Sequence, residues 1–248
     1  DNIDALYYYF YAIETGALGV SAYNAIGDEH LNVLKRFRNV FDLAYKRYID
    51  ITNAEAQARE AQIEVALEKI RSRSLAMHHS DELKEVMSVM FKKLTELEIL
   101  IGTVGILLFD EKTKNCDFWL QNQHQEPGIA RLPYDEKMMN EDNYMRDYWD
   151  AKTKGESFFN RKQTIEQKNR HFEYVFAHND IPQPVQEYLL QAQYHTQTFI
   201  VEKNSALLVD SWDERIYSME QIEVLKRVAK VFEQAYIRFL DLQKAEAQ

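Results

Sequence analysis

The sequence is short of several residue types, and each shortage excludes a class of structure. Its 248 residues include a single cysteine, Cys116, which excludes an intramolecular disulfide and fits a reducing compartment. Its seven glycines are not clustered, so no glycine-rich phosphate-binding loop is present. No apolar run approaches the ~20 residues that a membrane-spanning helix needs, and the N-terminus lacks a signal-peptide pattern. We therefore expect a cytoplasmic protein without membrane insertion.

The charge balance narrows the range of partners. Acidic residues outnumber basic ones by 40 to 30, and the net charge is −10. A surface of this sign repels phosphate backbones and anionic lipids, which argues against nucleic acid as a partner. A hydrophobic fraction of 46% and an aromatic fraction of 12% are enough for a substantial core.

One stretch, residues 28–77, contains neither proline nor glycine and reads as a single long helix. In its second half, positions four and three residues apart are apolar with one polar interruption; they are Ile63, Leu67, Ile70, Ser74 and Met77. This spacing is typical of the seam of a two-stranded coiled coil, so we expect a parallel homodimer through this helix. In its first half, a wider stripe that includes Phe37, Phe41 and Tyr48 predicts packing on a globular domain.

An internal repeat links the two ends of the sequence. Residues 33–57 return as residues 224–248, with identical residues at positions that include Leu34, Phe41 and Tyr45. Residues 9–23 align in the same way with residues 198–212. A repeat of this length indicates a repeated structural unit. We therefore expect residues 1–27 to be the C-terminal strands of a preceding domain of the same kind as the one that ends near residue 240, and the chain to be part of a longer tandem array.

The rest of the sequence predicts one complete domain over residues 80–240, after a signalling helix at 28–79 and before the start of a further linker at 241–248. Apolar runs predict strands at 103–110, 115–123, 128–134, 157–160, 194–202 and 205–212. Helical periodicity predicts helices at 141–151, 164–177 and 184–192, and another from residue 218. This order indicates an α+β fold with a central antiparallel sheet, helices on one face, and a concave side closed by the middle insertion.

Several stretches resemble a known family. Residues 54–86, AEAQAREAQIEVALEKIRSRSLAMHHSDELKEV, resemble the linker that precedes GAF domains in multidomain bacterial signalling proteins. Residues 118–123 (FWLQNQ), 155–160 (GESFFN) and the hairpin at 196–212 fit the same kind of sensor. The resemblance implies a GAF-like module of a tandem-GAF sensor with a histidine-kinase-type or similar output domain. It does not identify a ligand, because GAF domains share a fold while binding cyclic nucleotides, haem, bilins, small metabolites or nothing.

Departures from the family pattern disfavour two of these ligands. The residue cluster typical of cyclic-nucleotide-binding GAF domains is not seen, and Cys116 lies early in a strand instead of at a bilin-attachment position. No metal or haem motif is evident either. The sequence leaves the cofactor, if there is one, open.

Aromatic residues are the main candidates for a ligand site. They gather in the segments expected to cover the concave side of the sheet, and apolar pockets with a few polar groups are the usual small-molecule sites. The residues predicted to line such a pocket are Trp119, Arg131, Tyr148, Trp149, Phe172 and Tyr174. The alternative, that these aromatics fill the core, stays open because aromatics are ordinary core residues.

Catalysis has weak support. Cys116 and His124 would supply a thiol and a base, but no third residue to orient them is evident. His171 and His178 are seven residues apart, too far for a compact metal site. We expect a non-catalytic regulatory sensor that binds a small ligand or a partner and passes the signal through its helices to an output domain. The alternatives are a ligand-free dimerisation spacer and an enzyme that uses Cys116.

Overall fold

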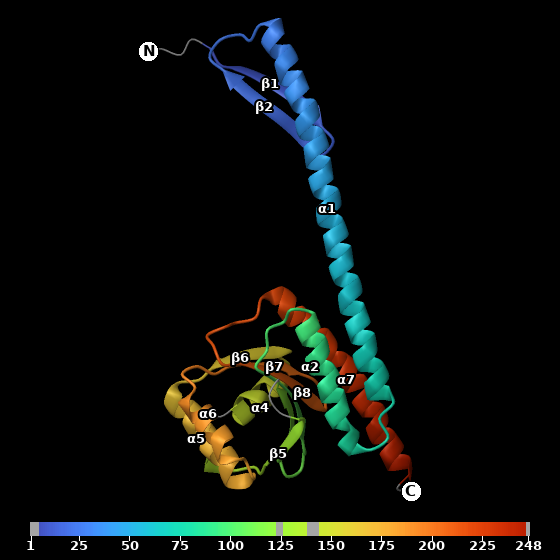
Figure 1. The fold of residues 1–248 in the computed structure, drawn as a ribbon, viewed down its shortest axis with the longest axis vertical. Helices are drawn as coiled ribbons and strands as arrows, with labels where there is room; N and C mark the ends of the chain where they lie inside the picture. The colour runs from blue at the N-terminus through green and yellow to red at the C-terminus, as the bar shows by residue number, and fades with distance from the viewer. Residues whose placement is uncertain (1–4, 123–125, 138–143, 247–248) are drawn as a thin grey trace. The chain divides into compact units, whose positions relative to one another are not determined.

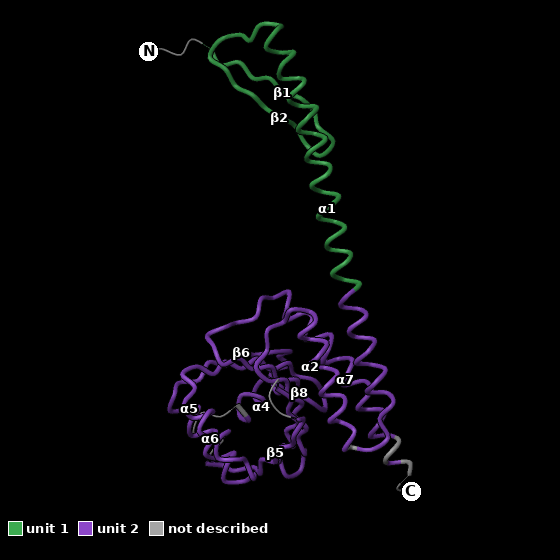
Figure 2. Tube along the Cα trace, viewed as in Figure 1, with its two compact units in different colours: residues 1–61 green, residues 62–248 purple. Residues whose placement is uncertain are grey.

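The structure is a computed structural model, and it describes residues 5–122, 126–137 and 144–246. Residues 1–61 and 62–248 form two compact units, coloured separately in Figure 2. Helix α1 (Asp28–Leu75) is continuous across the boundary between these units. Each unit has a sheet of its own.

The first unit consists of a β-hairpin and the first part of α1. Strands β1 (Tyr7–Ile13) and β2 (Gly16–Ala22) pair antiparallel, within the residues 1–27 that were expected to form strands. The hairpin turn is held to the helix, because the backbone N–H of Glu14 donates to Asp42 Oδ1 at 3.1 Å. Lys46 of α1 also forms an ion pair of 2.6 Å with the Glu14 carboxylate. These contacts fix the hairpin on one side of α1.

The second unit is built around a six-stranded antiparallel sheet (Figure 1). In spatial order its strands are β5 (Gly128–Leu132), β4 (Cys116–Asn122), β3 (Thr103–Phe109), β8 (Ser205–Ser211), β7 (Thr196–Val201) and β6 (Phe158–Lys162). The central strands β3 and β8 are apolar along most of their length because helices cover both faces of the sheet. The predicted strands agree with these ranges, which confirms the α+β fold class.

One face of the sheet packs on α2 (Leu83–Glu96), α7 (Met219–Glu246) and the C-terminal end of α1. These helices lie side by side in Figure 1. We call their shared apolar cluster the α7-side core; it includes Ile70, Met90, Ile106, Leu225 and Phe232. The stripe on α2 recurs every three or four residues, so one side of that helix is buried and the other is exposed.

The other face packs on the segment inserted between β5 and β7. This segment contains α4 (Tyr144–Lys154), α5 (Ile165–His178) and α6 (Gln183–Gln191), and it also supplies the edge strand β6. We call the cluster beneath it the α4-side core; it includes Leu107, Phe118, Tyr148, Val175 and Phe199. The insertion therefore covers the side of the sheet where it was expected, and helices lie on both faces rather than one.

The predicted coiled-coil stripe needs correction. Its five residues are at most 4% exposed within this single chain, and the apolar ones belong to the α7-side core; they are Ile63, Leu67, Ile70, Ser74 and Met77. Glu64 on the same helix forms an ion pair of 2.5 Å with Arg227 of α7. The heptad-like spacing is real, but the helices that it packs against belong to the same chain. A dimer through α1 remains a proposal and needs a different face of the helix.

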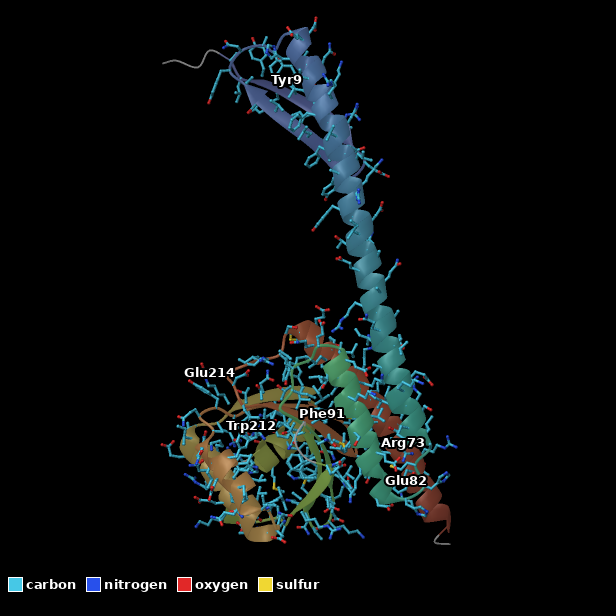
Figure 3. All side chains as sticks on the ribbon, viewed as in Figure 1. Tyr9, Arg73, Glu82, Phe91, Trp212 and Glu214 are labelled. Carbon is cyan, nitrogen blue, oxygen red and sulfur yellow. The ribbon has the colours of Figure 1, made fainter. Side chains whose placement is uncertain are left out.

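Polar contacts define the ends of several helices. At the start of α7, which was predicted from residue 218, Ser218 and Gln221 exchange hydrogen bonds with nitrogen-to-oxygen distances of 3.0 and 3.2 Å. Between α1 and α2, Glu82 accepts the backbone N–H groups of His78 and His79, each at 3.0 Å. Figure 3 shows Glu82 next to Arg73, which donates to it at 3.1 Å. None of the described helices is long and apolar enough to cross a membrane.

Candidate functional site

A row of polar side chains crosses the sheet on the α4 side. Strand register pairs Arg161 of β6 with Gln197 of β7. It then pairs Gln197 with Asp210 of β8, and Asp210 with Thr103 of β3. All four side chains are buried. Because side chains alternate along a strand, the four share the face that carries Phe199, two residues beyond Gln197. We call these four residues the polar row.

Two further buried residues extend the polar row. His195 precedes β7, and its carbonyl accepts the backbone N–H of Gln163 at 3.1 Å. The ring Nδ1 of His195 lies 2.6 Å from Gln163 Oε1, so Nδ1–H donates in this orientation of the amide. The ring Nε2 of His195 lies 3.5 Å from Asp210 Oδ2. Gln163, His195 and Asp210 therefore form one continuous polar contact beneath α5.

Three polar atoms of this group lack a hydrogen bond within the part of the chain that the structure describes. They are His195 Nε2, Gln197 Oε1 and Asp210 Oδ1, and each is inaccessible to solvent. Leaving a buried polar atom unpaired costs about 1–3 kcal/mol, so such atoms normally have a partner. A molecule with N–H or O–H groups would provide one. The polar row therefore has the donor and acceptor requirements of a small-molecule site.

Aromatic rings border this group. The Trp212 indole stacks on the His195 ring at a centroid distance of 4.5 Å and an angle of 13°. Phe172 of α5 lies 5.4 Å from the His195 ring and 5.8 Å from Trp212. Trp212, labelled in Figure 3, follows β8 directly in the sequence. The backbone of Gly102 passes close by, since a Cβ there would lie 2.7 Å from Trp212 Cδ1 and 3.0 Å from Asp210 Oδ1.

The positive charge in the polar row already has a partner within the protein. Arg161 forms an ion pair with Asp147 of α4, which balances its charge. His171 of α5 is buried, and its pKa is lowered to about 3, first by burial and then by the charges of His195 and Arg161. His171 is therefore neutral at physiological pH. The His171 ring therefore adds no second positive charge near Arg161.

The structure brings four of the six predicted pocket residues to the α4 side. Phe172 borders the polar row, as described above. Tyr148 is buried and stacks on Phe109 at 3.9 Å, and Trp149 packs edge-on against both rings. Tyr174 donates its hydroxyl to the Pro133 carbonyl at 2.7 Å. Only Phe172 of these four contacts the group around His195, while the other three contribute to the α4-side core and its border.

The other two predicted residues lie on the opposite face of the sheet. Trp119 belongs to the α7-side core, whereas Phe118 beside it belongs to the α4-side core. Arg131 pairs in register with Asp117, which shares the face of Trp119, and its side chain is largely exposed. The sequence did not indicate on which face of the sheet each of these residues lies. A strand alternates with a period of two, so an error of one position exchanges the faces.

The nucleophile considered from the sequence is unsuited to catalysis. Cys116 is buried in the α4-side core, and burial, aided by the charge of Asp117, raises the pKa of its thiol well above the ordinary value. A thiolate, the reactive form, is therefore disfavoured. His124 lies outside the described residues. Among the described residues, no group of three or more His, Cys, Asp or Glu side chains is placed to hold a metal ion.

Sequence reasoning did not identify the polar row itself. The signal available in the sequence was that polar residues stand at inward-facing positions of two buried strands. Gln197 is in phase with the inward Phe199, and Asp210 is in phase with the inward Leu208. A polar residue at an inward position of a buried strand marks either a structural network or a site. Only the pairing of β7, β8, β6 and β3 shows that these residues form one row.

Comparison with known proteins gives few matches. No protein-family model matches the sequence. No curated protein matches it either. Two solved structures are similar in chain path. A crystal structure of a methyl-accepting chemotaxis protein fragment is 16% identical with a TM-score of 0.43, covering 70% of this chain and 97% of that one. The phycoerythrobilin-bound GAF domain from a cyanobacterial phytochrome is 13% identical with a TM-score of 0.41, covering 73% and 97%. The site assignment therefore depends on the geometry described above.

Proposed function

We propose that residues 80–240 form a non-catalytic regulatory sensor module of a bacterial signal-transduction protein. The observation that carries this proposal is the polar row, where buried acceptor atoms have no hydrogen-bond partner among the described residues, on an otherwise apolar face of the sheet. The module binds a small molecule there and passes the effect through α7 to an output domain. A GAF-like architecture and a cytoplasmic location are part of the same proposal.

The chemistry of the polar row indicates the class of ligand. Gln197 Oε1 and Asp210 Oδ1 are hydrogen-bond acceptors, so they select N–H or O–H groups on the ligand. The rings of Phe172 and Trp212 offer flat apolar surfaces beside them. A small polar molecule with an amino or amide donor and a planar or apolar part meets both requirements. Arg161 is already paired with Asp147, which disfavours a strongly anionic ligand.

The same strands connect the polar row to α7 in two ways. At one end of β8, the loop that begins with Trp212 leads into α7, and Tyr217 in this loop donates its hydroxyl to the Leu100 carbonyl at 3.1 Å. At the other end, buried Glu233 of α7 accepts hydrogen bonds from the β7–β8 turn. Its carboxylate lies 2.8 Å from the Asn204 backbone nitrogen and 2.6 Å from Ser205 Oγ. A ligand that shifts β7 and β8 therefore changes the packing of α7 directly.

A signal requires two arrangements of these helices with different affinity for the ligand. The end of α1 and α7 share the α7-side core, so the helix that enters the domain and the helix that leaves it contact each other. We propose that ligand binding alters this contact.

A second candidate function is a ligand-free dimerisation spacer. The close stack of Tyr148 on Phe109 and that of Phe159 on Phe199 at 4.7 Å favour it, because both show tight packing of the α4-side core. In that case a dimer forms through exposed helix positions such as Val65 and Ile237, since the predicted seam is buried.

Native mass spectrometry of the purified chain separates the two candidates. A sensor retains a small molecule, or gains thermal stability from one member of a panel of free amino acids, purines and nucleosides. The variant Asp210→Ala should lose that response, while the control Asp117→Ala, on the other face and about half exposed, should keep it. A bare mass together with no stabilising compound in the panel would leave the spacer as the better explanation.

A further inference from the structure

The first unit repeats the C-terminal part of the second unit element by element. Strand β1 starts at Tyr7 and β7 at Thr196, 189 residues later; β2 starts at Gly16 and β8 at Ser205, again 189 residues later. Helix α1 starts at Asp28 and α7 at 219, 191 residues later. Both copies are an antiparallel hairpin followed by a helix. The sequence repeat is thus a structural repeat in which equivalent elements start at corresponding positions.

The two copies also share a specific internal contact. In the second unit, Glu233 of α7 accepts the backbone N–H of Asn204 in the hairpin turn. In the first unit, the equivalent helix position is Asp42, and it accepts the backbone N–H of Glu14 in the turn. Asp42 and Glu233 occupy equivalent positions of the repeat, so a carboxylate at this position holds each hairpin turn to its helix. The first unit is built like a piece of a domain.

Several equivalent apolar positions are exposed in the first unit and buried in the second. Phe10 of β1 is 71% exposed, while its equivalent Phe199 is fully buried. On the helix, Val40 is 71% exposed and its equivalent Val231 only 5%. The other exposed apolar positions of α1 whose equivalents on α7 are buried are Val33, Phe37, Phe41 and Tyr48. An apolar face of this extent is unusual on a surface that has no partner.

The strand edges show the same difference. In the second unit, β8 pairs with β3 on its outer edge and β7 pairs with β6. Among the described residues of the first unit, β1 and β2 pair only with each other. Their outer edges therefore present unpaired backbone groups that a further strand would satisfy.

We propose that the exposed face of β1, β2 and α1 is a docking surface for the body of a second domain of the same fold. This body would be equivalent to residues 62–195, and it would precede this unit in the same polypeptide. It would supply two strands to the open edges and two helices to the stripe on α1, as β3, β6, α2 and the end of α1 do in the second unit. The first part of helix α1 would then pack in the core of the preceding domain, while its C-terminal end packs in the core of the second unit.

This proposal does not depend on ligand binding at the polar row. A second copy of the chain is a less suitable occupant. In a dimer of two identical chains, each hairpin could pair with the other along one strand edge. The repeat instead requires a strand on both edges of the hairpin and, at the same time, helices on the exposed apolar positions of α1.

A chimera tests the proposal. An additional copy of residues 62–195 is joined directly to Tyr7 of the chain, so His195 precedes Tyr7 as it precedes Thr196, and strand register is kept. Amide hydrogen exchange in β1 and β2 should slow by about 100-fold or more relative to the unmodified chain. Exchange in β3 and β8 of the second unit serves as the folding control.

Two substitutions with equal exposure sharpen the test. Val40 and Leu43 are each 71% exposed, but the equivalent of Val40 is buried Val231, whereas the equivalent of Leu43 is exposed Gln234. In the chimera, Val40→Asp should abolish the protection and Leu43→Asp should preserve it. Unchanged exchange in β1 and β2, or equal effects of the two substitutions, would overturn the proposal. Concentration-dependent protection of the unmodified chain at the mass of a dimer would overturn it in favour of a second copy.

Discussion

At the scale of single residues, His171 is expected to make the domain acid-sensitive. Its pKa is about 3 in the folded protein because burial disfavours the imidazolium, against an ordinary value near 6.5 in the unfolded chain. The unfolded state therefore binds more protons below pH 6.5, and stability that is complete above that pH falls as the pH decreases toward 3. Between pH 7 and pH 5 the loss from this residue alone should be about 2 kcal/mol.

The variant His171→Leu isolates this contribution. Urea unfolding of parent and variant at pH 7 and pH 5 measures how far the free energy of unfolding of each protein falls between the two pH values. This fall should be about 2 kcal/mol smaller for the variant than for the parent. His178, whose ring Nδ1 lies 2.9 Å from the Tyr174 carbonyl at an exposed position, provides the control substitution to Leu. An identical pH dependence of parent and His171→Leu would show that the folded protein accepts the proton without cost.

A side chain at Gly102 is expected to destabilise the domain. A methyl group there would lie 2.7 Å from Trp212 Cδ1, so the indole or the strand must move. We expect Gly102→Ala to destabilise the domain by about 1–3 kcal/mol, a usual cost of overpacking, and to change the fluorescence and near-ultraviolet circular dichroism of Trp212. Gly128→Ala is the control, because its added Cβ would meet nothing within 4 Å. Equal stability of the two variants would contradict the packing of Trp212 on Gly102.

At the scale of elements, the C-terminal end of α1 behaves as a core helix, and Ser74 shows this most clearly. Ser74 is buried, and its hydroxyl has no hydrogen-bond partner among the described residues. Ser74→Ala removes this unpaired group, so it should leave stability unchanged or raise it by up to about 1 kcal/mol. Ser74→Leu adds volume to a filled core and should cost about 1–3 kcal/mol.

Thermal unfolding of the two Ser74 variants, measured at several protein concentrations, checks this prediction. In a seam between two chains, leucine would strengthen association and raise the melting temperature as concentration increases. A lower melting temperature that does not change with concentration supports the core position seen in the structure. A concentration-dependent increase would restore the intermolecular interpretation.

At the scale of the whole chain, the two units should differ in stability. The second unit has a six-stranded sheet between two layers of helices, while the first has two strands with a largely exposed surface. Local stability follows burial, so amides of β1 and β2 should exchange about 100-fold faster than those of β3 and β8. Hydrogen exchange followed by mass spectrometry at low protein concentration measures this. Similar protection in both hairpins would mean that the exposed face of the first unit is covered in solution.

The sequence alone determined the elements and their order. Residues 103–109 form a strand because they are continuously apolar, and Ser218 with Gln221 starts α7 because their side chains match the free N–H groups of a helix end. The repeat was also visible directly, and the corresponding start positions of β1 and β7 and of β2 and β8 follow from it. These features depend on interactions within a few residues or on a pattern written along the chain.

Only the tertiary structure decided which surfaces meet. The spacing of Ile63, Leu67 and Ile70 is the same for a partner helix and for a helix of the same chain, so packing against α7 could not be inferred from it. Trp119 lies on the α7 side because of its phase in β4, whereas Phe172 lies on the α4 side because α5 packs there. The polar row joins residues of four strands that are far apart in the sequence, and long-range register alone places Asp210 between Gln197 and Thr103. Local preference sets each element, whereas burial of the summed apolar surface sets their arrangement.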